Sequence, residues 1–424
     1  MPRDRVAVIG AGVSGLTAAH VLQREHDVTL FEAENRLGGH AHTHDLDTVS
    51  VDSGFIVHNA ATYPNLIRLF AELGVATQDS EMSMSVRDES TGLEYAGARG
   101  PAGLFAQRRN VASPRHLGML AEVLRFHRAA RRVLAGRSAL DEDVTLGEFL
   151  RRGRFSRYFV DTFAVPVVSA VWSSGPELSM QYPARYLFAF LANHGMLSVG
   201  GSHQWKTVVG GSARYVEQVV KGLSAVEVST PVRAITRDAE GVEVRDDADG
   251  AHRFDRVVVA THAPTALSLL SAPTAAEREV LGAFEYSANE TWLHTDTSVL
   301  PTAPDARASW NLLRVPGEDR VLVSYDMTRL MRLDGASGAT GYGHGPDTYV
   351  VTLNATDRID PSTVIARMDY EHPAYTPASV GAQKRLPELN DGRIAFAGAY
   401  HGWGFHEDGC ASGVRAAASF GVPW

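Results

Sequence analysis

The first forty residues alternate between short apolar runs and helical spacing. The β-branched run at 5–9 predicts a buried strand, and the apolar spacing at 16–24 predicts a helix. Between them lies the turn Gly10-Ala-Gly-Val-Ser-Gly15. A second apolar strand is predicted at 27–31, and it ends on Glu32. Strand, glycine turn, helix and terminal acid together predict a dinucleotide site.

Each glycine of this turn has a distinct physical use. Gly10 permits the tight turn, Gly12 lets the backbone approach a pyrophosphate, and Gly15 lets the helix pack closely on the strand. The phosphates would then meet the unpaired amides and the positive dipole end of the helix. Glu32 follows Gly10 by 22 residues, where a ribose hydroxyl needs an acceptor, and this acid argues against the 2′-phosphate of NADP.

Further along the chain, the pattern alternates helical blocks with groups of strands. An amphipathic helix is predicted at 63–73, and residues 104–157 form an Arg-rich helical block that continues to a helix at 184–194. Strands are predicted at 292–295, 320–325 and 349–353, a helix at 361–370, a last strand at 393–400 and a final helix at 410–418.

The segment Glu32-Ala33-Glu-Asn-Arg36-Leu-Gly38-Gly39-His40 decides between NAD and FAD. It resembles the extension after the second strand in flavoproteins of the amine oxidase and phytoene desaturase superfamily. The resemblance implies FAD. His40 stands where that superfamily usually carries Arg, and a neutral imidazole donates to a phosphate with less charge.

Three further stretches resemble the same superfamily. Val51-Asp-Ser-Gly54-Phe55-Ile56 matches the stretch beside the flavin ring, and Gly210-Gly211 matches the return to the FAD domain. Val232 and Thr261 match positions near the cofactor. The closing segment 398–409 resembles the motif whose helix N-terminus points at the pyrimidine end of the flavin. It departs twice: Ala399 and Tyr400 replace a usual acid, and one extra residue lies between Gly404 and Gly409.

The resemblance implies an α/β fold with a Rossmann-like FAD-binding domain, made of a parallel sheet with an antiparallel meander, and an α+β substrate domain with an inserted helical region. We assign 1–70, 195–275 and 385–424 to the FAD-binding domain and 71–194 and 276–384 to the substrate-binding domain. The expected cofactor contacts are Gly10, Gly12, Val13, Ser14, Gly15, Glu32, Ala33, Arg36, Gly38, Gly39, His40, Gly54, Phe55, Ile56, Val232, Thr261, Gly398, Ala399, His406, Glu407 and Asp408.

Few catalytic side chains are obligatory, because the flavin carries the redox step. The resemblance suggests Phe405 as one aromatic wall of a substrate site, with Tyr400 or Trp403 as another, although these rings could equally pack around the flavin. Lys206 could hold a water beside the flavin, and His406 could bond the ring or act as an acid or base. The alternative for both is a structural role.

The spacing of Cys410 does not match the thioether position of the superfamily, so non-covalent FAD is expected. His42 and His44 are interpreted as loop histidines, because the spacing supplies no further metal ligands. No metal site is predicted.

Composition restricts the function further. The net charge of −9 gives no reason to expect nucleic-acid binding overall, and a lone cysteine fits a reducing compartment. The chain lacks an apolar run of about 18 residues, and no signal peptide precedes the first strand, so a cytoplasmic protein is expected. Residues 108–157 hold 12 arginines against five acids, a net charge of +7. This segment could contact the anionic inner face of a membrane, or it could be a solvated basic face.

Three functions remain open at this stage. The first is an FAD oxidoreductase that moves a hydride at a C–C bond of a fatty acyl or other apolar substrate. The second is an amine oxidase that releases hydrogen peroxide. The third is a flavin-binding partner of a lipid-modifying enzyme. The Gly-Gly-His, Gly-Phe-His-Glu-Asp-Gly and terminal Pro-Trp segments resemble bacterial FAD proteins that accompany cyclopropane or methyl-branched fatty acid enzymes.

Overall fold

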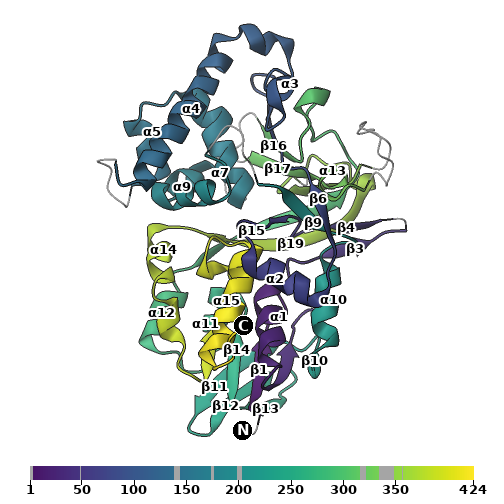
Figure 1. The fold of residues 1–424 in the computed structure, drawn as a ribbon, viewed down its shortest axis with the longest axis vertical. Helices are drawn as coiled ribbons and strands as arrows, with labels where there is room; N and C mark the ends of the chain where they lie inside the picture. The colour runs from purple at the N-terminus through teal and green to yellow at the C-terminus, as the bar shows by residue number, and fades with distance from the viewer. Residues whose placement is uncertain are drawn as a thin grey trace.

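The structure is a computed structural model. It describes residues 3–47, 49–137, 144–172, 176–197, 203–315, 321–333, 348–355 and 357–424. Figure 1 shows two parts, one built on a parallel sheet and one combining a second sheet with a group of helices. Both chain ends lie in the part with the parallel sheet (Figure 1).

A five-stranded parallel sheet forms the centre of the first part. Across the sheet its strands are β10 (Ala225–Glu227), β2 (Asp27–Phe31), β1 (Arg5–Ile9), β14 (Arg256–Val259) and β20 (Ile394–Phe396). Strand β1 is apolar from Val6 to Ile9 because both faces of the sheet are covered. Val6 and Val8 pack toward the helices α1 (Val13–Leu22) and α15 (His406–Ser419), whereas Ala7 and Ile9 pack toward the opposite core.

That opposite core is covered by an antiparallel meander and short helices. The meander consists of β11 (Val232–Asp238), β12 (Gly241–Asp246) and β13 (Ala251–Phe254). The helices are α11 (Ala263–Leu269), α12 (Ala275–Leu281) and α14 (Pro377–Gln383). Ala382 of α14 and Val280 of α12 belong to this core, although their sequence positions fall in the range assigned to the substrate domain.

A seven-stranded mixed sheet forms the base of the second part. Its order is β19 (Val364–Ala374), β15 (Glu285–His294), β18 (Val350–Leu353), β17 (Val321–Asp326), β16 (Trp310–Arg314), β7 (Met84–Asp88) and β8 (Leu93–Gly97). Only the pairing of β16 with β7 is parallel among these neighbours. A short helix, α13 (Met327–Met331), follows β17.

Helices cover this sheet at the end of the molecule away from β1 (Figure 1). They are α3 (Gly100–Leu104), the 3-10 segment η1 (Arg108–Ala112), α4 (Pro114–Leu134), α5 (Leu146–Arg152), α6 (Arg157–Phe159), α7 (Val165–Trp172), α8 (Pro176–Gln181) and α9 (Ala184–Asn193). The widened turn Val160–Ala164 joins α6 to α7. Among the described residues no helix is long and apolar enough to cross a membrane.

Small sheets connect the two parts. The hairpin β3 (Thr43–Asp45) with β4 (Ser50–Asp52) follows the first glycine-rich segments, and β9 (Trp205–Val208) pairs with both β5 (His58–Asn59) and β6 (Thr77–Ser80). The helices α2 (Pro64–Leu73) and α10 (Ala213–Lys221) pack beside α1.

One predicted helix and the start of another differ from the structure. Residues 361–370 do not form a helix, because β19 pairs antiparallel with β15 over its whole length. Its side chains alternate as a strand requires, with Met368 and Tyr370 buried and Asp369 and Glu371 exposed. The last helix begins at His406 rather than at 410, because Gly409 N already donates to Phe405 O at 3.1 Å.

Helices α1 and α15 approach each other through glycine. A Cβ on Gly413 would lie 2.4 Å from Ser14 O and 3.0 Å from Ala18 N. A Cβ on Gly409 would lie 2.6 Å from Val13 Cγ1. This contact holds the N-terminal glycine turn against the first turn of α15.

We therefore expect Gly413→Ala to lower the free energy of unfolding by about 1–3 kcal/mol, because the helices must separate to admit the methyl group. The matched control is Gly381→Ala in α14, where a Cβ meets nothing within 4 Å. That change should stabilise by about 0.5–1 kcal/mol, since glycine is unfavourable inside a helix. Urea denaturation of both variants tests this, and a Gly413→Ala midpoint equal to wild type would contradict it.

Candidate functional site

The glycine turn has the geometry of an anion cradle. Gly10 adopts φ +100°, and a Cβ there would lie 2.9 Å from Ala260 O. A Cβ on Gly15 would lie 1.9 Å from Gly10 O, whereas one on Gly12 would meet nothing within 4 Å. No side chain caps the N-terminus of α1. The turn is thus closed on the strand side and open at Gly12, where amides and the helix dipole favour a phosphate.

Glu32 lies directly against this turn. Its Oε2 accepts a hydrogen bond from Ala11 N at 2.7 Å, and its Oε1 accepts one from Glu34 N at 2.9 Å. Each carboxylate oxygen has a further lone pair for a ribose hydroxyl. Thr230 N donates to Glu32 O at 2.8 Å, which brings the start of β11, and with it Val232, alongside. Ala33 is exposed next to Glu32.

The segment 36–41 folds back against the turn and leaves the open side of Gly12 free. Gly38 N donates to Ala11 O at 2.9 Å, and a Cβ on Gly39 would lie 3.2 Å from Gly12 Cα. Arg36 Nη1 donates to Gly39 O at 2.8 Å and its Nη2 pairs with Glu34. The Arg36 guanidinium thus fixes the backbone of this segment through its hydrogen bond to Gly39 O.

His40 lies among aromatic side chains from distant segments. Its ring stacks on Tyr370 of β19 at 4.8 Å, with the rings of His372 at 5.6 Å and His262 at 6.4 Å. Its Nε2 is buried and has no hydrogen-bond partner in the part of the chain that the structure describes, and burial lowers the pKa of this imidazole well below its usual value. The position that usually holds a charged Arg is therefore neutral here, with one polar atom available to a ligand.

The stretch 54–56 links this region to α15. A Cβ on Gly54 would lie 2.2 Å from His40 O. Phe55 stacks on His406 with ring centres 3.8 Å apart and planes 9° from parallel. Ile56 points the other way, into a core with residues of β4, α13 and β18.

The residues of the closing motif have well-defined partners. His406 Nε2 lies 2.7 Å from Tyr215 Oη, and burial lowers the pKa of His406 to about 3. Glu407 accepts from Asn65 N and Leu66 N at the N-terminus of α2. Asp408 accepts from Phe405 N at 2.9 Å, and burial raises its pKa to about 7. Both acids stabilise the backbone in this structure.

Gly398 and Ala399 lie directly before the turn that leads into α15. Gly398 N donates a hydrogen bond to Ser412 Oγ at 2.9 Å, and Ala399 O accepts from the amides of Gly402 and Gly404. Thr261, at the end of β14, lies against Gly10. The Gly10 turn, the 36–56 segment and the 398–409 segment thus converge from three separate parts of the chain.

The structure does not bring all four suggested catalytic residues together. Lys206 lies on β9, where Nζ pairs with Asp79 Oδ1 at 3.4 Å and the register partner is His58. Tyr400 is buried in the core with Phe284, on the far side of the parallel sheet from Phe55. Phe405 instead stacks on Phe190 of α9 at 4.9 Å.

A histidine that the sequence analysis passed over lies at the centre of an aromatic cluster beside Phe405. The centre of the His194 ring lies within 6.4 Å of the centres of five other rings. Its Nδ1 is hydrogen-bonded to Phe190 O at 3.0 Å. Burial lowers the pKa of His194 to about 4, so the ring is neutral at pH 7. The aromatic cluster consists of Tyr63, Phe190, His194, Trp205, Trp403 and Phe405. The four-residue spacing of Phe190 and His194 on one helix was the available signal.

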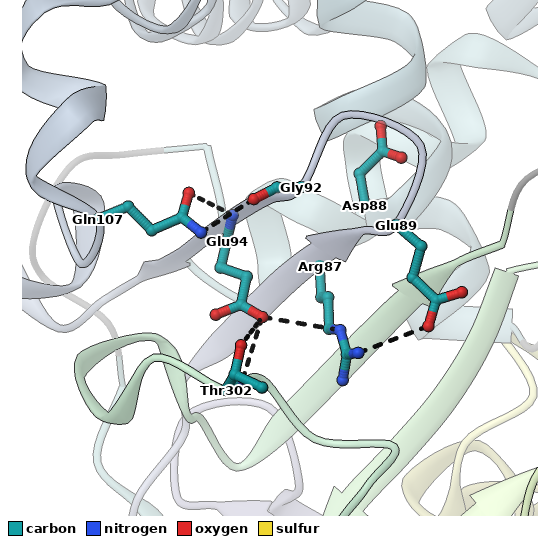
Figure 2. A pocket seen from close by; sticks show the side chains of 7 residues that line it. All are labelled: Arg87, Asp88, Glu89, Gly92, Glu94, Gln107 and Thr302. Carbon is teal, nitrogen blue, oxygen red and sulfur yellow. Dashed lines mark hydrogen bonds and ion pairs between the residues drawn. The ribbon is translucent and has the colours of Figure 1, made fainter.

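A polar cavity of about 320 Å³ lies elsewhere, at the β7–β8 edge of the seven-stranded sheet. Figure 2 shows Arg87 between Glu89 and Glu94 there. Glu94 also accepts from Thr302 N and Ala303 N. The edge is opposite to β19, which contacts His40, so this cavity is separate from the converging segments.

Comparison with known proteins places the chain in a family. The profile of the flavin containing amine oxidoreductases matches residues 13–335, well over half of the chain. The chain belongs to this family. A Mycobacterium tuberculosis protein named as a flavin-containing monoamine oxidase is 31% identical over 254 residues, 57% of this chain and 53% of the relative. The chain thus matches about half the length of this curated relative.

Solved structures support the same fold. Cyclohexylamine oxidase from Brevibacterium oxydans aligns over 99% of both chains, with a TM-score of 0.67 and 17% identity. A fatty acid isomerase from P. acnes that produces CLA aligns over 98% of both chains, with a TM-score of 0.68 and 16% identity. At these identities the likeness concerns the fold.

FAD is the cofactor of this family, and the chain's residues fit it. The open face at Gly12 suits a pyrophosphate, and Glu32 retains acceptor capacity for a ribose. His40 Nε2, which is buried without a hydrogen-bond partner among the described residues, is a further polar atom that a ligand could engage. When bound, FAD supplies the acceptor or donor of a hydride; the protein supplies orientation, exclusion of water and electrostatics.

Replacing Glu32 by alanine should weaken FAD binding. Hydrogen bonds to a charged group contribute roughly 1.5–3 kcal/mol, which predicts a dissociation constant about ten- to 150-fold higher. Glu25→Ala, an exposed acid between α1 and β2, is the control. Titration of the apoprotein with FAD measures both constants. Equal constants for Glu32→Ala and wild type would show that Glu32 only organises the turn.

Stability should fall as the pH drops from about 6.5 toward 4. Buried histidines whose pKa lies at about 3–4 when folded take up protons only on unfolding, so the stability they contribute is present above 6.5 and lost below it. Three carboxyls, Asp52, Glu407 and Asp408, have raised pKa values and act with the opposite sign. They are outnumbered by the histidines with lowered pKa, which are His40, His42, His44, His58, His116, His127, His194, His294, His372, His401 and His406.

Urea unfolding at pH 7.5, 6, 5 and 4.5 (roughly the window in which these imidazoles titrate) measures this slope. His406→Gln should flatten it by up to about 1.4 kcal/mol per pH unit, the linkage of one proton. A stability that rises on acidification would show that the three carboxyls dominate.

Proposed function

We propose that this flavoprotein transfers a hydride to or from a C–C bond of an apolar substrate, with a fatty acyl or other lipid-like chain as the substrate class. The observation that supports this is the aromatic cluster at the start of α15. The Phe405 and Trp403 rings, which directly precede the helix of the flavin motif, contact Phe190 of α9 and His194, the residue that follows α9. Sites for apolar ligands are lined in this way, with few polar groups.

The electrostatics of the cluster support a neutral substrate. His194 is neutral at pH 7, since its pKa is about 4. The carboxyl of Asp408 is already engaged by Phe405 N. A cationic amine buried here would need a partner charge that this carboxyl supplies only in part, because a buried charge without a partner is strongly disfavoured.

Amine oxidation is the second candidate, and one observation favours it. The relative from Mycobacterium tuberculosis is named as a monoamine oxidase, and Trp403 with Phe405 offers two rings beside the flavin motif. The rings of Phe405 and Phe190 already stack on each other in this structure, so a substrate nitrogen would have to separate them.

We also propose that FAD is bound non-covalently. Cys410 is the only cysteine of the chain, and it is buried with Thr17 Oγ1 3.4 Å from its sulfur, between α15 and α1. Burial raises the pKa of this thiol, which keeps it protonated and unreactive. Acid precipitation should release a yellow supernatant.

Anaerobic flavin spectroscopy separates the candidates. Unsaturated and saturated acyl chains are mixed with the oxidised and with the dithionite-reduced protein, and a panel of primary amines is treated in the same way. We expect acyl compounds to bleach the oxidised flavin or to reoxidise the reduced one. If they are isomerised instead, the redox state of the flavin shows no net change. Amines should leave the spectrum unchanged and give no peroxide in air. Bleaching by an amine with peroxide release would establish the second candidate.

A matched pair of variants tests the aromatic cluster. Phe405→Asn should raise KM for the apolar substrate about tenfold, because a polar amide replaces a half-buried apolar ring, whereas Phe405→Leu should stay close to wild type. Bound FAD, measured from its absorbance, confirms that each variant is folded. Equal KM values for the two variants would remove the cluster from the substrate site.

A further inference from the structure

The outer face of α4 exposes apolar side chains that the fold does not use. Leu117 is 45% exposed and Leu124 is 42% exposed, and Val111 in the preceding segment η1 is 57% exposed. Leu117, Ala121 and Leu124 are spaced by four and three residues, so they lie on one face of the helix. The opposite face, with Met119, Phe126, Ala130 and Val133, already fills the core.

The second half of the same face is basic. Arg125, Arg128, Arg131 and Arg132 are exposed over the last three turns. Arg125 pairs with Glu122, and Arg131 Nη1 donates to Leu197 O, whereas Arg128 and Arg132 have no ion-pair partner among the described residues. Glu122 is half-buried and also accepts from Ser156, and it is the only acid on α4. We call Val111, Leu117, Ala121, Leu124, Arg128 and Arg132 the α4 face.

The charge of this region contrasts with the rest of the chain. Residues 108–157 carry a net charge of +7 within a chain of −9. Exposed leucines followed by unpaired arginines on one helix are typical of a surface that meets an anionic lipid interface, where side chains and headgroups satisfy both kinds of residue. A nucleic acid would attract the arginines but would give the leucines no apolar partner.

Helix α4 adjoins the proposed substrate site through its other, buried face. Helix α4 packs on α9, with Arg185 Nη1 donating to Val133 O at 3.2 Å and Phe126 in ring contact with Phe188. Phe190 of α9 and His194, which directly follows this helix, belong to the aromatic cluster. Figure 1 places α4 in the part of the molecule away from the parallel sheet.

We propose that the α4 face docks this protein on an anionic phospholipid surface, so that an apolar acyl substrate passes from the lipid layer between α4 and α9 toward the aromatic cluster. The docking itself rests on the exposure and charge of the α4 face, and the passage rests on the proposed function. The contact is peripheral, with the leucines at headgroup depth and the arginines on the headgroup phosphates.

The test is co-sedimentation of the full-length, FAD-loaded protein with vesicles, without substrate. One vesicle is phosphatidylcholine alone, and the other is two parts phosphatidylcholine to one part phosphatidylglycerol. Each basic residue near an anionic surface strengthens binding about fivefold. We therefore expect binding to the anionic vesicle to weaken about 25-fold in the double variant Arg128→Gln/Arg132→Gln and to fall steeply with salt.

Two further variants separate charge from apolar contact. Leu117→Ser/Leu124→Ser should weaken binding at high and low salt alike. Arg151→Gln/Arg152→Gln removes the same charge from α5, where both arginines pair with Glu148, and should bind like wild type. Flavin absorbance and circular dichroism confirm that each variant is folded.

Equal binding of the α4-face variants and wild type, equal binding to both vesicles, or no binding to either would overturn the proposal; in the last case an acidic protein becomes the partner to seek. Because no turnover is measured, this result is independent of the spectroscopic test of the substrate class. Vesicle binding with amine oxidation would retain the docking surface and reject the acyl substrate.

Discussion

The contact between α1 and α15 is the constraint on which the rest of the site depends. The two helices start about four hundred residues apart in the chain, yet Gly409 and Gly413 let α15 lie directly on Val13 and Ser14. This approach places the open glycine turn and the first turn of α15 on the same side of the parallel sheet. Two helix N-termini, each with a positive dipole end, therefore lie on one side of the sheet.

Around this contact the chain buries polar groups in neutral or fully bonded form. His406 is neutral between Phe55 and Tyr215, and His40 is neutral on Tyr370. Asp52 is fully buried and accepts from Thr43 Oγ1 and from Ser212 N, which ties the β3–β4 hairpin to the turn before α10. Such an environment makes electrostatic interactions strong and leaves the redox chemistry to the flavin.

The family motifs were readable from local sequence, but the partners of their side chains were not. Glu407 and Asp408 were expected to contact the cofactor; in the structure Glu407 binds the first amides of α2, 341 residues away in sequence, and Asp408 holds the Phe405 amide. The predicted helix at 361–370 is wrong, because the pairing of this segment with β15 is also set by the fold and not by local sequence. This segment pairs with β15 as a strand, and its alternate side chains Met368 and Tyr370 are buried. The Tyr370 ring stacks on His40.

The sequence by itself determined the strand, turn and helix of the first forty residues, the acid at Glu32 and the family, because these depend on local periodicity, glycine conformation and fixed spacing. Only the tertiary structure decided which residues surround the site. His194 lies at the centre of the aromatic cluster, His262 and His372 flank His40, and Tyr400 lies in a different core from Phe405. These relations join segments from separate sheets and helices, so packing fixes them and no local pattern encodes them.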